Sequence, residues 1–274
     1  MQLLPLILAA ALYGGLGVHF WRTRWREGGN RSVSTPMQTW ERLAIAGALL
    51  PHGLALQGMM FPGDGMHFSF ALALSLMMWI AVLIYWLESF MARMEGMQPM
   101  VLPLAAVAAL APVLFSENHL VSNADSVGFR LHFLAAMLAY SLFTLSALHA
   151  IFMGFTERAL HQHTLTRSLA SLPPLLSMER LLFRMLGTGF LLLTVAVGSG
   201  ALFSEAIFAK PFSLDHKTVF AIASWVVFGV LLVGHHVWGW RGKRALRLTL
   251  TGFAFLILAY LGSRFVAEVI LGRI

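Results

Sequence analysis

Three histidines in separate apolar stretches could act together as ligands of a metal centre. His52 lies well inside one stretch, His132 opens another, and His216 immediately precedes a third. Neutral imidazole nitrogens from different helices can bind haem iron axially, bind zinc, nickel or copper, or relay protons. Three basic residues are predicted at a similar depth and could pair with the carboxylates of a ligand: Arg130, Lys217 and Arg264.

The composition indicates what kind of molecule positions these side chains. Of the 274 residues, 58% are hydrophobic and only 11% are charged, whereas about a quarter of the residues in soluble domains are charged. This excludes a soluble globular enzyme, a disordered chain and a collagen-like chain, and it favours a membrane protein. The chain has no cysteine, which excludes disulfides, thiolate metal sites and iron–sulfur clusters.

Apolar stretches of about 20 residues recur along the whole sequence, and a stretch of that length crosses a bilayer as a helix. We predict an all-α polytopic bundle of about eight transmembrane helices, forming a single integral membrane domain over residues 1–274. The predicted segments are Gln2–Trp21, Gln38–Phe61, Phe68–Glu88, Met100–Phe115, Leu131–Phe155, Met185–Phe208, Thr218–Trp240 and Leu248–Leu271.

The positions of the basic residues predict the orientation of this bundle. Most of the 19 lysines and arginines lie in or beside the connections that follow the first, third, fifth and seventh segments. Because cytoplasmic connections are enriched in basic residues, both termini are predicted on the external, periplasmic side of a bacterial inner (plasma) membrane. The net charge of +7 is then a consequence of orientation, and no nucleic-acid partner is predicted.

Depth along the helices selects among the histidines. A bis-histidine haem needs two imidazoles from different elements at matched depth, one on each face of the porphyrin. His52 and His132 meet this condition and are predicted to be the axial ligands of a haem iron, with His216 as the alternative to His52. His149 lies about 25 Å from His132 along the same helix, so it is predicted to lie outside the site.

The second part of the chain resembles a known family in five successive stretches. A helix that begins near His132 is followed by a glycine-rich helix, by a stretch in which Lys217 precedes Trp225, and by a final loop and helix. In their order and spacing, these stretches resemble the cytochrome c assembly family of haem-handling membrane proteins. They are Phe129–Tyr140, Arg184–Gly200, Asp215–Trp225, Gly239–Ala245 and Gly252–Gly262, within a region of about residues 129–274.

The resemblance implies contact with haem and a role in cytochrome c assembly or haem-protein biogenesis. The family's external histidine corresponds to His132, and His216 and Lys217 stand where the segment after the family's external loop begins. Larger members carry a tryptophan-rich loop there, whereas the stretch Phe208–His216 of this chain has no tryptophan. The chain is therefore similar to the short, eight-span branch of HemX-like and YpjD-like inner-membrane proteins, and b-type haem is expected to bind transiently.

A binding or accessory protein is the function that these observations predict. No nucleotide loop, catalytic triad or paired-carboxylate site is evident, so the chain is not predicted to be an enzyme. The expected partners are the lipid bilayer, haem and other membrane biogenesis proteins, and a loop flanked by Glu205 and Lys210 is expected to close over the site. The alternative is an accessory subunit or regulator of inner-membrane divalent-cation transport that binds no haem.

Overall fold

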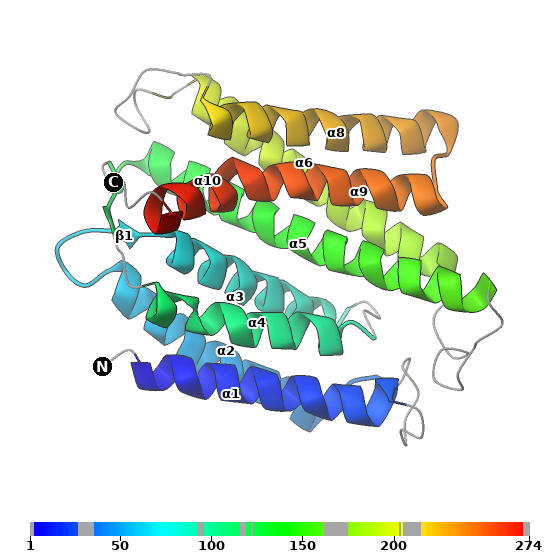
Figure 1. The fold of residues 1–274 in the computed structure, drawn as a ribbon, viewed down its shortest axis with the longest axis horizontal. Helices are drawn as coiled ribbons and strands as arrows, with labels where there is room; N and C mark the ends of the chain where they lie inside the picture. The colour runs from blue at the N-terminus through cyan, green and yellow to red at the C-terminus, as the bar shows by residue number, and fades with distance from the viewer. Residues whose placement is uncertain are drawn as a thin grey trace.

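The computed structural model describes residues 3–26, 36–91, 96–115, 119–121, 123–161, 175–202, 204 and 215–270. These residues form a bundle of long helices, with one pair of very short strands and three π-helical turns (Figure 1). The elements are α1 (Leu3–Phe20), η1 (Trp21–Trp25), α2 (Thr39–Met60), β1 (His67–Phe68), α3 (Phe70–Glu88), α4 (Gln98–Leu114), β2 (His119–Leu120), α5 (Val127–His161), α6 (Leu175–Leu202), α8 (His216–Trp238), α9 (Gly242–Ile257), η3 (Leu258–Gly262), α10 (Ser263–Phe265) and η4 (Val266–Ile270).

Eight helical segments cross the bundle from one end to the other. Seven of the described helices are long and apolar enough to cross a membrane. The shorter α4 packs between α1 and α3 and runs between the same two ends (Figure 1). Gly17 of α1 faces Pro103 of α4 so closely that a Cβ would lie 2.8 Å from the proline ring. The predicted all-α polytopic bundle of about eight helices is confirmed.

The two ends of the bundle differ in charge. At one end, which we call the terminal end, α1 begins at Leu3 and η4 ends at Ile270 (Figure 1). At the other, which we call the basic end, α2 begins at Thr39 and α3 ends at Glu88. The described basic residues at or near the basic end are Arg22, Arg24, Arg26, Arg42, Arg158, Arg180, Arg184, Arg241, Lys243, Arg244 and Arg247. That the basic end faces the cytoplasm stays a prediction.

The helices form two groups that meet along one interface. Helices α1 to α4 pack on one another, and α5, α6, α8 and α9 pack on one another (Figure 1). The main contact between the groups is between α3 and α5, where the Ser141 hydroxyl donates to the Met77 carbonyl at 2.9 Å. Within the second group, the buried Tyr140 hydroxyl donates to the Leu256 carbonyl at 2.9 Å, two residues before the π-helical η3 begins.

Three helices begin a turn or more earlier than the apolar segments that predicted them, and the largest shift is in α6, which begins at Leu175 instead of Met185. Helix α5 begins at Val127 instead of Leu131, because the Ser126 hydroxyl accepts a hydrogen bond from the Phe129 amide and caps the helix there. The last transmembrane segment begins at Gly242 instead of Leu248. Its first residues are strongly basic but still helical, and hydropathy marks only the apolar part of a helix.

Candidate functional site

His132 lies at the terminal end, where α5 meets α6. Its Nδ1 is 2.9 Å from the hydroxyl of Ser199, and that hydroxyl donates its single proton to the Ala196 carbonyl. When Nδ1 donates this bond to Ser199, the lone pair of the neutral imidazole is on Nε2. A hydrogen bond that fixes the tautomer in this way is typical of a histidine that binds a metal through its other nitrogen.

His216 and Lys217 begin α8 at the same end of the bundle, and both are exposed. The helix starts here because Asp215 caps it, accepting hydrogen bonds from the backbone amide and the hydroxyl of Thr218 at 2.9 Å. Burial raises the pKa of the Asp215 carboxyl, but the hydrogen bonds from Thr218 outweigh that effect and hold the pKa below its ordinary value. Helix α6 packs on both α5 and α8, so it links the element of His132 to that of His216.

The other two predicted cations are also near the terminal end, in different surroundings. Arg130 is exposed on the first turn of α5 and forms an ion pair with Asp125 at 3.0 Å. Arg264 is half-buried in α10, with its guanidinium 5.8 Å from the ring centre of Tyr260. The Tyr260 ring in turn contacts Phe68 of β1, so Arg264 borders an aromatic cluster.

His52 is completely buried between α1, α2 and α3. Its Nε2 is 2.9 Å from the Ser75 hydroxyl, and its Nδ1 is 3.4 Å from the Tyr13 hydroxyl. These partners belong to the first helix group, whereas the partner of His132 belongs to the second. These hydrogen-bond partners of His52 and His132 therefore lie in different helix groups. The two histidines were predicted as a pair because they lie at a similar depth along their helices.

His149 is buried near the basic end of α5, away from His132, as predicted. Its Nε2–H donates to the Met178 carbonyl at 2.9 Å, and its Nδ1 is 3.2 Å from the Met97 sulfur. The predicted loop residues Glu205 and Lys210 lie outside the described part of the chain. In the part that is described, no three histidine, aspartate or glutamate side chains gather as a metal site.

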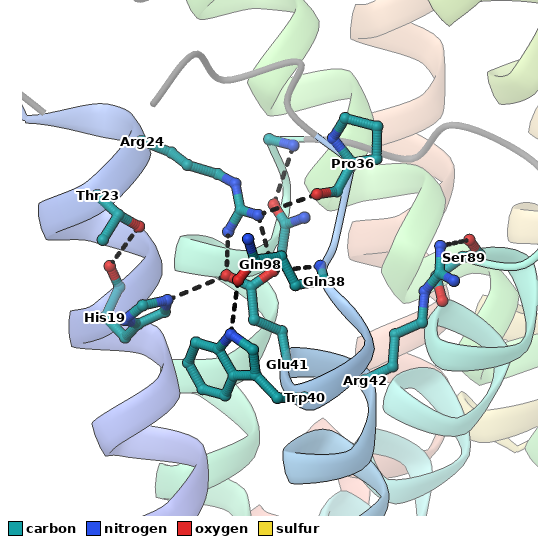
Figure 2. Close-up of polar contacts among 11 residues, drawn as sticks. His19, Thr23, Arg24, Pro36, Gln38, Trp40, Glu41, Arg42, Ser89 and Gln98 are labelled. Atoms are coloured by element: carbon teal, nitrogen blue, oxygen red, sulfur yellow. Dashed lines mark hydrogen bonds and ion pairs between the residues drawn. The ribbon is translucent and has the colours of Figure 1, made fainter. Parts of the chain in front are cut away.

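A buried ion-pair cluster at the basic end was missed by sequence reasoning (Figure 2). Arg24 and Glu41 are both fully buried, and the two guanidinium NH groups bond the two carboxylate oxygens at 3.2 and 2.9 Å. His19 Nε2 adds a contact of 3.0 Å and the Gln38 backbone amide one of 2.7 Å. The π-helical turn Trp21–Trp25 carries Arg24 inward.

Some signal for this cluster was present in the sequence. Glu41 stands three residues after Gln38 at the start of an apolar segment, which is the spacing of a capping box. Arg24, however, is one of several arginines after the first segment, and only the three-dimensional structure separates this buried one from the exposed ones.

Comparison with known proteins places the chain in a family. The family described as Cytochrome C assembly protein matches residues 40–271. Inner membrane protein YpjD of Escherichia coli K12 is 30% identical over 237 residues, which are 84% of this chain and 89% of that protein. An uncharacterized 28.8 kDa protein of Azospirillum brasilense is 32% identical over 209 residues, 73% of this chain and 76% of that protein.

A third relative matches only a short part of the chain. Cytochrome c biogenesis protein CcsA of Gloeobacter violaceus is 30% identical over 92 residues, which are 34% of this chain and 27% of that protein. No solved structure matches the chain. The family match begins at residue 40 and so includes helices of both groups. With eight helices crossing the bundle and a match over most of its length, the chain belongs to the cytochrome c assembly protein family.

Proposed function

We propose that this protein binds haem in the bacterial inner membrane and takes part in cytochrome c assembly or haem-protein biogenesis. The family match and the partial similarity to proteins named for cytochrome c biogenesis support the process. Similarity to a protein named for the inner membrane supports the location. The proposed role is binding or accessory, without catalysis by this chain.

The His132–Ser199 hydrogen bond is the observation that carries this proposal. Haem supplies an iron that takes imidazole nitrogens at its two axial positions, and two propionates that pair with cations. In the tautomer in which Nδ1 donates to Ser199, Nε2 carries the lone pair that an iron ligand requires. Arg130 and Lys217, exposed at the same end of the bundle, are the proposed partners of the propionates, with Arg264 as a third cation.

For the second axial position, the geometry favours His216 over His52. His52 would have to leave two hydroxyl partners in a fully buried site before either nitrogen could bind iron. His216 is exposed at the first turn of α8 and needs no such rearrangement. We therefore propose His132 and His216 as the ligand pair and His52 as a structural residue. The exposure of His216 is consistent with transient binding of b-type haem.

Purification in detergent after expression with sufficient haem tests the proposal. The wild-type protein should show a Soret band and a positive pyridine haemochrome assay, and His132→Ala should lose most of the bound haem. His67→Ala is the matched control, because His67 lies at the same end, with its Nε2 bonded to Asp64. A wild-type protein without haem would sink the proposal.

The same spectra decide between the two ligand pairs. His216→Ala should convert the low-spin spectrum to a high-spin one, while His52→Ala should leave the haem spectrum unchanged in the fraction that folds. The opposite result, with His52→Ala converting the spectrum and His216→Ala silent, would establish the pair that sequence depth predicted.

A further inference from the structure

The connection between α8 and α9 is held in one conformation by several contacts. Gly239 and Gly242 have φ angles of +64° and +56°, in the left-handed region that glycine adopts without strain. His235 Nδ1–H donates to the Trp240 carbonyl at 3.0 Å. The Trp240 ring lies so close to Gly234 that a Cβ there would overlap it. The connection is thus built to fix the position of Trp240.

Indole rings gather at this connection. Trp238 is 64% exposed, and its ring stacks on that of Trp240 with centroids 5.5 Å apart. Because the connection joins two membrane-spanning helices, these rings lie at the level where a bilayer meets water. Tryptophan is enriched at that level, where it contacts both acyl chains and headgroups.

Three cations share one side of α9, and one of them lies over an indole ring. Lys243 and Arg247 are four residues apart and Arg244 and Arg247 are three apart, so all three share a helix face. All are exposed, whereas Ala245 and Thr249 on the other side are buried. The Arg244 guanidinium sits 5.0 Å from the Trp240 ring centre, a cation–π contact that orients it.

These cations differ from the three cations at the basic end that have carboxylate partners. Arg24 pairs with Glu41, Arg184 with Glu88 and Arg241 with Glu179. Within the described residues, Lys243, Arg244 and Arg247 form no ion pair with a carboxylate. A surface that carries three exposed cations, one of them oriented by an interfacial indole, is complementary to an anionic headgroup.

We propose that Lys243, Arg244 and Arg247, with Trp238 and Trp240, form a binding site for an anionic phospholipid, which we call the α8–α9 lipid site. The phosphate of the headgroup is held by the cations, and the indoles pack against the glycerol region and upper acyl chains. The occupant is a lipid and not a soluble anion because the site is at a membrane interface and two of its five side chains are apolar rings.

Titration of the purified full-length protein with phosphatidylglycerol, followed by the thermal unfolding temperature, tests the site. Each cation at an anionic surface contributes roughly fivefold in affinity. The triple variant Lys243→Gln, Arg244→Gln and Arg247→Gln should therefore need on the order of 100-fold more lipid for the same stabilisation. Phosphatidylcholine should stabilise the wild type far less, and about 1 M salt, with a Debye length near 3 Å, should remove the difference.

A second triple variant serves as the matched control. Arg22→Gln, Arg26→Gln and Arg180→Gln remove the same charge from exposed positions at the same end, and their lipid dependence should stay within about twofold of the wild type. Should the first triple variant not fold, the double variant Lys243→Gln and Arg247→Gln leaves the Arg244–Trp240 contact intact and should still lose about 25-fold.

Three results would overturn the proposal. Equal losses in the two triple variants would mean that diffuse charge, and not a site, attracts the lipid. Equal stabilisation by inorganic phosphate would mean that the site takes a free anion. A wild-type protein that does not distinguish phosphatidylglycerol from phosphatidylcholine would leave the cations for a different partner, such as an acidic protein segment.

Discussion

Glu41 accepts hydrogen bonds from both NH groups of the fully buried Arg24, and from His19 and the Gln38 amide, which are partly buried. An exposed ion pair gains little from its Coulomb attraction, because water competes for both charges. A buried pair is different, since removing one partner leaves a charge without compensation in a region of low dielectric. The Arg24–Glu41 pair therefore holds η1 against the start of α2.

Glu41→Gln is expected to lower the free energy of unfolding by about 3–5 kcal/mol, because Arg24 stays buried without a carboxylate. Glu88→Gln breaks an ion pair between the side chains of Arg184, which is 55% exposed, and Glu88, which is 30% exposed. This substitution should lower the free energy of unfolding by only about 0–1 kcal/mol. Thermal or chemical unfolding in detergent measures both. Replacement of both Arg24 and Glu41 by methionine should recover much of the loss, and a Glu41→Gln variant as stable as Glu88→Gln would contradict this account.

Ser199 offers a test of the haem proposal that does not touch a ligand. Ser199→Ala removes the hydroxyl that contacts His132 Nδ1 and orients the ring, so haem affinity should fall by about 10–100-fold. Ser199→Thr keeps the hydroxyl and should bind as the wild type does. Soret titration of the purified protein measures the affinities. Ser263→Ala, which removes a hydroxyl bonded only to the carbonyls of Ala259 and Tyr260, is the control.

The sequence predicted single residues unevenly. His132 was found because it opens a helix and matches a family position, but its partner Ser199 is 67 residues away in the chain. His52 was assigned to iron from its depth alone. Depth says how far a residue is along a helix, but not that hydroxyl groups of α1 and α3 meet its two nitrogens. Contacts between helices were the information that was missing.

At the scale of elements, the long apolar runs predicted every crossing helix, and the structure moves mainly their ends. Hydropathy does not report polar helical turns, so the predicted starts of α5, α6 and α9 are too late. The strands β1 and β2 have two residues each. A strand this short has no alternation of apolar and polar residues that could be recognised in the sequence. The turns η1 and η3 lie in apolar or basic stretches whose sequence is equally compatible with an α-helix. Their π-helical conformation could therefore not be predicted.

Close packing between elements can be tested with two glycines in crossing helices. At Gly252 of α9, a Cβ would lie 2.8 Å from the Phe228 ring, and that ring is stacked on Phe143. Gly252→Ala should therefore destabilise the protein by about 1–3 kcal/mol. Gly198 of α6 has no atom within 4 Å of its would-be Cβ, so Gly198→Ala should stabilise by about 0.5–1 kcal/mol.

Thermal unfolding of the two variants in detergent gives the comparison directly. The control is informative because both substitutions add one methyl group to a helix interior and differ only in what that methyl group meets. Equal unfolding temperatures for Gly252→Ala and the wild type would mean that α8 and α9 are less closely packed than described.

The direction of the whole molecule in the membrane is predicted by its charge bias. The natural chain has no cysteine, so single cysteines can be introduced without a background. Asp125→Cys, at the terminal end, should react with a membrane-impermeant maleimide in intact cells or spheroplasts. Met91→Cys, exposed at the basic end, should react only after the membrane is permeabilised. The reverse pattern would place both termini in the cytoplasm and contradict the charge bias.

Synthesis on the ribosome delivers the two helix groups one after the other. Helices α1 to α4 find their partners among themselves, so this part of the protein can pack while α5 is still being translated, as is usual for units that fold in chain order. The completed α3 then presents the surface on which α5 docks, followed by α6, α8 and α9. The early helices are thus a template for the later ones, and the end of α6 that carries Ser199 meets His132 only after α5 has docked and before α8 and α9 are added.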